Sequence, residues 1–217
     1  MHIVARAVVS GGLMLSASLA WAADGASANL GITNDFIWRG VSQTDNRFAV
    51  QGGADYNDKT GLYIGAWGSN VDIKNANVRV DLYGGYRFKT DSGLMGDVGA
   101  ITYRFDGGGL SFSELYGSLT FANYTAKLSH DWRNDRTYVE AGALYDLGSK
   151  VNFGVHAGHY TGGNINNPSG YNDYSVGLGT TVSDFDITLT VSDTDIRPAT
   201  DRSNANVALL VKKTFRE

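Results

Sequence analysis

Apolar and polar side chains alternate at every second residue through nearly the whole chain. In the segment 185–192, Phe185, Ile187, Leu189 and Val191 are apolar, and the residues between them are polar. Successive side chains of a β-strand point to opposite faces, so this pattern predicts a strand that separates two different surroundings. No segment after residue 23 shows the 3.6-residue period of an amphipathic helix. We therefore expect an all-β fold.

Turn-forming residues divide the chain into about twelve alternating segments. We expect strands at residues 27–38, 47–57, 62–71, 78–89, 94–105, 112–121, 124–132, 136–147, 151–161, 171–182, 185–195 and 204–215. The connections after even-numbered strands are short. Those after odd-numbered strands are mostly longer, as at 39–46, 72–77, 162–170 and 196–203. Tight turns on one rim and long loops on the other are typical of an antiparallel up-and-down β-barrel of the bacterial outer membrane.

The alternation alone does not say which face of the barrel is apolar. A soluble lipocalin-like barrel buries its apolar face, whereas a transmembrane barrel exposes that face to lipid. The strand lengths match the roughly 9–11 residues that cross hydrocarbon at a tilt. Charged residues on the polar face would be costly in a dry core. These features predict a transmembrane barrel.

Aromatic residues of the apolar face cluster near the strand ends, where Tyr and Trp favour the headgroup boundary. They are Phe36, Trp38, Phe48, Tyr56, Tyr86, Phe88, Phe121, Tyr124, Trp132, Phe153, Tyr174, Phe185 and Phe215.

The N-terminus has the organisation of a secretory signal peptide. Arg6 is followed by an apolar run at 7–20, and Ala20-Trp21-Ala22 supplies a small-x-small cleavage site. We expect residues 1–22 to be removed and residues 24–217 to form the barrel. The alternative is an uncleaved N-terminal anchor, for which the apolar run is too short to span a bilayer. We therefore expect the protein to be exported through the periplasm and to reside in the outer membrane of a Gram-negative cell.

Several stretches resemble the TorF-type porin family. The resemblance is carried by residues 34–46 (NDFIWRGVSQTDN), 51–56 (QGGADY), 61–71 (GLYIGAWGSNV) and 213–215 (KTF). The resemblance implies an outer-membrane barrel and identifies no catalytic residues. The chain departs from outer-membrane barrels, which typically end on an aromatic residue, because Arg216-Glu217 follow Phe215. We expect the last strand to be the signal for the barrel-assembly machinery.

Charged residues of the polar face predict the lining of a lumen. The candidates are Arg79, Asp81, Arg87, Arg104, Lys127, Asp131 and Asp186. Opposite charges across a lumen orient small polar solutes. The segment 39–47 is rich in hydrogen-bonding groups, so it predicts a loop constriction by Arg39, Gln43, Asp45 and Arg47.

These features predict a porin-like channel for the passive diffusion of small polar solutes, without cofactor or metal. One alternative is a closed structural or adhesive barrel, in which the charges pair and hold the lumen shut. The net charge of −4 gives no reason to expect a nucleic-acid partner, and the absence of Cys excludes disulfides and thiolate metal sites.

The second alternative is a hydrolase in the barrel wall, with a Ser, a His and an acid near the outer rim. His159 has Asp173 and Ser175 on the neighbouring strand as candidate partners. His156 and His159 point to opposite faces of their strand, so they cannot act together. We therefore expect no enzymatic activity.

Overall fold

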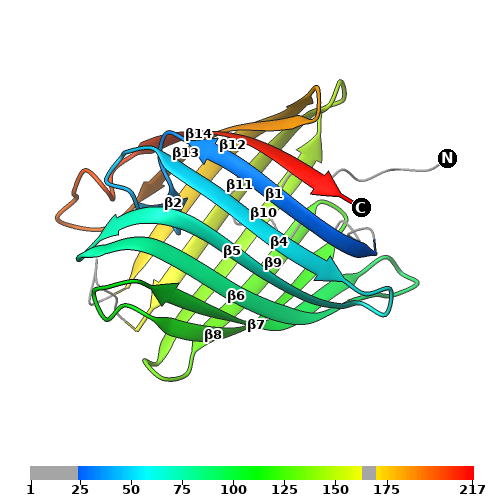
Figure 1. Ribbon diagram of the computed structural model, residues 1–217, viewed down its shortest axis with the longest axis horizontal. Coiled ribbons are helices and arrows are strands. Elements are labelled where there is room, and N and C mark those ends of the chain that lie inside the picture. Colours follow the sequence, from blue (N-terminus) through cyan, green and yellow to red (C-terminus); the bar gives the residue numbers. More distant parts are fainter. Residues whose placement is uncertain (1–23, 163–169) are drawn as a thin grey trace.

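The chain forms a closed antiparallel barrel of twelve strands in the computed structural model, which describes residues 24–162 and 170–217. Each wall strand pairs with its neighbours along the chain, and the first strand pairs with the last (Figure 1). The predicted twelve-strand up-and-down barrel is confirmed. The signal peptide predicted for residues 1–22 lies outside the described residues.

The wall strands match the expected segments to within a few residues, apart from the first. They are β1 (Gly25–Thr33), β4 (Ala49–Asn57), β5 (Leu62–Ile73), β6 (Ala76–Lys89), β7 (Met95–Phe105), β8 (Phe112–Phe121), β9 (Tyr124–Asp131), β10 (Arg136–Asp146), β11 (Val151–Thr161), β12 (Tyr171–Val182), β13 (Phe185–Thr194) and β14 (Asn206–Arg216). Among the described residues, no helix is long and apolar enough to cross a bilayer.

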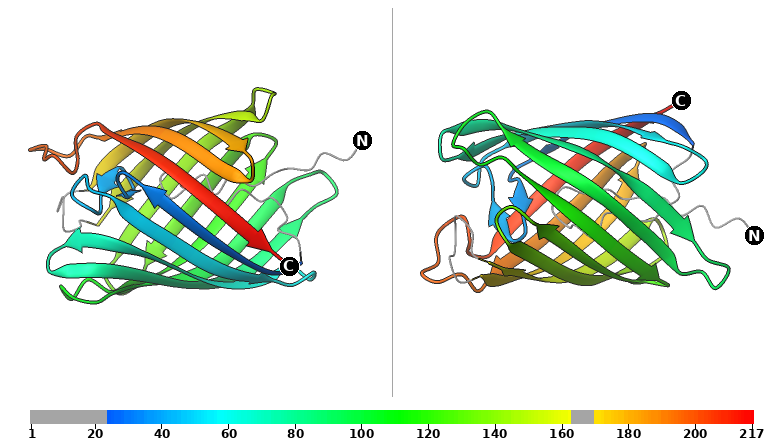
Figure 2. Two further views of the ribbon diagram at one scale, coloured as in Figure 1. Left: turned by 45° about the horizontal axis from the view of Figure 1, so that its top comes forward. Right: turned by 90° about the horizontal axis from the view of Figure 1, so that it is seen from below.

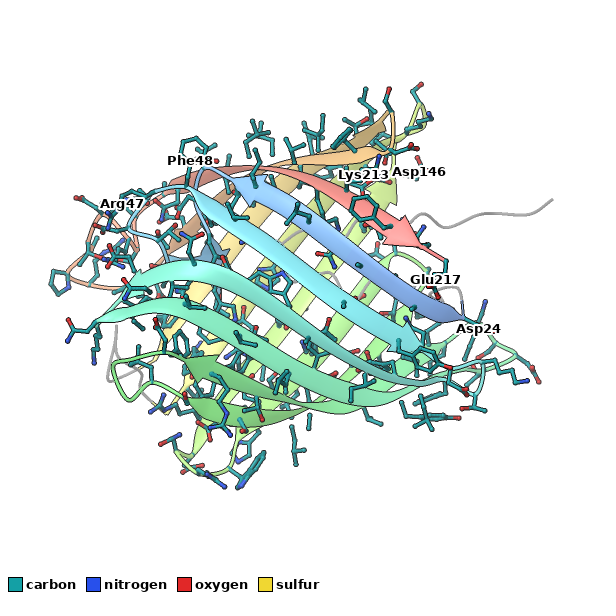
Figure 3. All side chains as sticks on the ribbon, in the orientation of Figure 1. Asp24, Arg47, Phe48, Asp146, Lys213 and Glu217 are labelled. Carbon is teal, nitrogen blue, oxygen red and sulfur yellow. The ribbon has the colours of Figure 1, made fainter. Side chains whose placement is uncertain are left out.

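The barrel has two different rims, which we name here. The terminal rim holds Asp24 and Glu217, and the loop rim lies at the opposite end, beside Arg47 (Figure 3). The terminal rim has only tight turns, such as the one at 122–123, and the loop rim carries the long segments 34–48 and 195–205. The longest described connections therefore lie at one rim.

One expected long loop is a tight turn. Strands β5 and β6 extend to Ile73 and Ala76, which leaves only Lys74 and Asn75 between them. Both residues have positive φ angles, 44° and 71°. A turn with two positive φ angles matches the twist of a hairpin, so the strands continue pairing up to it. Residues 163–169 of the expected loop 162–170 lie outside the described residues.

Apolar side chains cover the outside of the barrel and polar side chains fill its inside. Leu189 and Leu209 are partners in the β13–β14 register and are 44% and 47% exposed. Their neighbours Thr188 and Thr190 point inward and are buried. Such an apolar belt is costly in water and is stable against hydrocarbon.

The first strand ends earlier than expected, and this changes the position of two aromatic residues. Phe36 is only 3% exposed, and Phe36 and Trp38 both lie inside the barrel instead of on its outer face. The wall strand stops at Thr33 because the side chain of Asn34 takes over the hydrogen bonds with the main chain of β14. Its Nδ2 donates to the Val207 carbonyl (2.9 Å), and its Oδ1 accepts from the Leu209 N–H (2.6 Å). The chain is thereby released from the wall and turns inward.

The apolar belt predicts a depth-dependent cost of charge. We expect Leu189→Arg to lower the free energy of unfolding by about 2–4 kcal/mol, because it places a cation in the middle of the belt. Leu62→Arg is the matched control at the first residue of β5, next to the terminal rim, and should cost about 0–1 kcal/mol. Denaturant titration of protein refolded into phospholipid vesicles measures both. Equal costs at the two positions would contradict an apolar belt centred on Leu189.

Candidate functional site

The chain between β1 and β4 folds into the barrel as a small hairpin. We call residues 34–48 the inner hairpin; it contains β2 (Ile37–Trp38) and β3 (Val41–Ser42), which pair with each other. Figure 2 shows these two strands inside the wall, towards the loop rim. The tip is a two-residue turn of Arg39 and Gly40 with φ angles of 49° and 76°.

Hydrogen bonds inside the hairpin hold its base in one conformation. Asp35 Oδ1 accepts from the hydroxyls of Ser42 (2.6 Å) and Thr44 (2.9 Å). The Gln43 N–H donates to the Phe36 carbonyl at 2.6 Å. Burial raises the pKa of the Asp35 carboxyl, although the two hydroxyls oppose this shift. The hairpin is thus a folded element rather than a loose loop.

Three of the four predicted constriction residues lie at the base of the hairpin. The Gln43 carbonyl accepts from the Asp72 N–H (2.7 Å), and Asp45 pairs with Arg202 Nε (3.0 Å). Arg47 forms an ion pair with Asp72, and its side chain is 65% exposed. These residues tie the hairpin to the neighbouring connections at the loop rim. Arg39 alone reaches deep into the barrel.

The Arg39 guanidinium is held against the opposite wall by a carboxylate and aromatic rings. Its two terminal nitrogens donate to the two oxygens of Glu114 on β8, both at 2.8 Å. Its Cζ lies 4.1 Å from the ring centre of Tyr138 and 4.4 Å from that of Trp38. Both side chains of the ion pair are 2% exposed. A bidentate, desolvated pair of this kind fixes the position of the hairpin tip.

The tip also contacts the β12–β13 wall. The Tyr171 hydroxyl donates to the Arg39 carbonyl at 2.9 Å. A methyl group on Gly40 would lie 2.5 Å from Thr194 Cγ2 and 2.7 Å from Asp173 Cβ. Only a glycine allows this approach, so the tip bridges two sides of the barrel.

A second buried ion pair lies in the wall beside the hairpin. Arg79 on β6 donates from Nε and one terminal nitrogen to the two oxygens of Asp81, both at 2.8 Å. Aromatic rings surround the guanidinium, including Tyr103 at 4.6 Å and Trp38 at 5.0 Å. Both predicted lumen residues point inward, where they neutralise each other.

The half of the barrel near the terminal rim holds the more accessible charges. Arg87 pairs with Asp97 (3.4 Å), and Lys127 pairs with Glu140 (3.8 Å). The cationic side chains of these pairs are 23% and 20% exposed, in contrast to the sealed pair at the hairpin tip. Asp186 faces inward and accepts from the Thr181 hydroxyl at 2.8 Å.

Two predicted lumen residues have other surroundings. Arg104 is exposed, and its partner in the register is Val80 on the outer face, so its side chain lies outside the barrel. The alternation of β7 places Tyr103 inward instead. Asp131 is fully buried at the loop-rim end of β9, where it accepts from the N–H groups of Arg133 and Asn134. Its carboxylate stabilises the turn that follows the strand.

The residues proposed for a hydrolase do not assemble into a triad. His156 lies inside the barrel between Glu140 (3.2 Å from Nε2) and Asp173 (3.5 Å from Nδ1). His159 is exposed and bonds to Asn172. The Ser175 hydroxyl is buried without a hydrogen-bond partner among the described residues. Ser175 is therefore not hydrogen-bonded to either histidine.

Inward tyrosines lie flat against glycines of the neighbouring strands. A methyl group on Gly65 would lie 2.5 Å from the ring of Tyr83, and one on Gly99 would lie 2.5 Å from the Tyr116 hydroxyl. The Tyr83 hydroxyl donates to Asp55 at 2.6 Å. The glycines let these rings rest on the wall, which keeps them out of the centre of the lumen.

Several inward acids were missed in the sequence, above all Glu114, Asp97 and Asp55. Glu114 and Asp55 lie in the polar phase of their strands, so the alternation was the available signal for these two. Glu114, for example, shares its phase with Ser118. Asp97 shares its inward phase with Ile101 and Tyr103, so the pattern of β7 gave no such signal.

The Arg39–Glu114 pair predicts a large stability effect. We expect Glu114→Gln to lower the free energy of unfolding by about 3 kcal/mol, because it leaves the Arg39 guanidinium buried without a counter-charge. Arg47→Gln is the matched control in the same hairpin and should cost about 0–1 kcal/mol, because its ion pair is exposed. Denaturant titration in lipid measures both variants. Equal effects would show that the buried pair does not anchor the hairpin.

The comparisons with known proteins agree with this architecture. One solved structure, described as "KdgM porin", is 8% identical over 88% of this chain and 99% of that chain, with a TM-score of 0.63. Another, "NanC porin structure in rhombohedral crystal form", is 11% identical over 89% of this chain and 100% of that chain, with a TM-score of 0.62. At these identities the likeness concerns the fold. No curated protein matches the chain.

A family match covers nearly the whole chain, from residue 20 to residue 216. The chain belongs to the family described as "Bacterial protein of unknown function (Gcw_chp)".

Proposed function

We propose that the protein is a porin-like channel of the Gram-negative outer membrane, through which small polar solutes diffuse passively. The observation that carries this proposal is a closed barrel with an apolar outer belt and a charged interior. A soluble barrel would have the opposite arrangement. The resemblance to TorF-type porins and the porin-like fold support the same function.

In this proposal the two halves of the lumen have different roles. The terminal half is the wet part, because the side chains of Arg87 and Lys127 remain partly exposed there. The loop-rim half is the constriction, because the inner hairpin and the sealed Arg39–Glu114 pair occupy it. Passage then depends on the position of the hairpin. We further propose that β14, the last strand, is the signal read by the barrel-assembly machinery.

A closed structural barrel is the second candidate, and the same hairpin favours it. If the tip never leaves Glu114, the loop-rim half stays filled. The two functions differ in one measurable property, the conductance of the protein in a lipid bilayer.

The proposal predicts discrete conductance steps when the mature protein is added to a planar bilayer. We expect Arg87→Glu to shift the ion selectivity towards cations, because it reverses a charge that is accessible from the lumen. Arg104→Glu is the matched control, since this side chain lies on the outer face, and it should leave selectivity unchanged. Silent bilayers at every voltage would reject the channel in favour of the closed barrel.

The tyrosines on the wall predict a second effect on conductance. We expect Gly65→Ala to reduce the single-channel conductance, because the new methyl group pushes the Tyr83 ring into the lumen. Gly68→Ala on the outer face is the matched control, since its methyl group would meet no atom closer than 3.5 Å. An unchanged conductance in both variants would place Tyr83 away from the solute path.

A further inference from the structure

The Arg39 side chain occupies a site to which the barrel wall contributes a carboxylate and two aromatic rings, and the hairpin's own Trp38 adds a third ring at 4.4 Å. Glu114 supplies a carboxylate, and the rings of Tyr138 and Tyr160 lie 4.1 and 5.3 Å from the guanidinium carbon. The Tyr103 hydroxyl donates to Glu114 Oε2 at 3.1 Å and orients that carboxylate. We call these four residues the wall cage. They belong to β7, β8, β10 and β11, so the barrel holds them rigidly.

The wall cage has the chemistry of a receptor for a planar cation. Two carboxylate oxygens face the two terminal nitrogens of the guanidinium, and aromatic faces complete the site. A site that offers both bidentate pairing and ring stacking favours a planar guanidinium over a point charge such as an ammonium. Arg39 Nε has no hydrogen-bond partner among the described residues. The wall therefore forms hydrogen bonds only with the outer end of the group, which any alkylguanidinium also carries.

The turn itself does not account for an arginine at position 39. Its φ angle of 49° lies in the left-handed region, where Asn or Gly is favoured, and Gly40 follows it. An Asn-Gly pair would form this turn with less strain. The arginine is thus explained by its contacts with the wall.

The charge balance of the interior also favours cations. The carboxylates buried in the described residues outnumber the buried lysines and arginines: Asp35, Asp81, Asp97, Glu114, Asp131, Glu140 and Asp173 against Arg39, Arg79 and Lys212. If the hairpin tip moved away, Glu114 would lose its counter-charge while the aromatic rings of the wall remained around it. A carboxylate in such a setting favours a replacement cation.

We propose that the wall cage binds small solutes that carry a guanidinium group, and that Arg39 is an internal occupant which such a solute displaces. Binding would then open the constriction for its own ligand. This role in passage rests on the proposed channel, whereas the binding site can be tested independently of it.

The test uses Arg39→Asn, which removes the guanidinium and keeps a residue suited to the turn. We expect the folded variant in detergent to bind ethylguanidinium saturably in isothermal titration calorimetry. The neutral analogue ethylurea should not bind. Adding Glu114→Gln should weaken ethylguanidinium binding by about tenfold or more, because the charged hydrogen bonds are lost. Wild type should bind more weakly than Arg39→Asn, since Arg39 competes.

Arg47→Asn is the matched control, because it removes an arginine of the same hairpin that does not reach the cage. It should bind no better than wild type. If Arg39→Asn is not folded by circular dichroism, Arg39→Gly replaces it in the same titration. Absence of saturable binding by the folded variant, or equal binding of ethylurea, overturns the proposal.

Bilayer recordings separate this inference from the channel. Binding by Arg39→Asn together with silent bilayers supports the cage and rejects the channel. Conductance without any binding supports the channel and rejects the cage.

Discussion

The pairing of β1 with β14 is the contact on which the rest of the structure depends. It joins Ser27 to Arg216 and continues to Thr33 and Leu210, so it closes the hydrogen-bond ladder around the barrel. Hydrocarbon offers no partner to a free N–H or carbonyl group, and a sheet with open edges is therefore not stable within a bilayer. Closure also separates an inside from an outside, which gives each strand its two surroundings.

The inner hairpin depends on a local release from that ladder. The Asn34 side chain forms hydrogen bonds with the Val207 carbonyl and the Leu209 N–H of β14. The main chain can therefore leave the wall without leaving these two groups unpaired. The hairpin then carries Arg39 across the lumen to Glu114. A charged side chain becomes stable in this buried position because the wall provides both a counter-charge and aromatic faces. The proposed constriction and the proposed cation site therefore share one physical cause.

Charge pairing differs along the inside of the barrel. The pair at the hairpin tip is sealed, and the pairs of Arg87 and Lys127 are partly accessible. Accessible charges are screened by water and contribute little to stability, and in the proposed channel they are the charges that a solute would meet. Buried pairs favour a single conformation, because separating them exposes uncompensated charge.

The sequence by itself determined the wall of this protein. A period of two is a local property, so the alternation around Leu189 and the turn at 122–123 were enough to predict the strands, their number and the sorting of most loops. The inward acids such as Glu114 followed the same rule and could have been recognised. Arg104 was predicted to line the lumen, but the register pairs it with Val80 on the outer face. The two phases of β7 differ too little in polarity for the sequence to show this.

Only the tertiary structure decided what fills the barrel. Phe36 and Trp38 continue the strand-like pattern of residues 27–38, yet they lie inside, because Asn34 ends the wall strand through contacts with β14, more than 170 residues away in the chain. The Arg39–Glu114 pair likewise joins residues 75 positions apart. Such contacts depend on how the closed barrel brings distant strands together, and no local pattern encodes that distance.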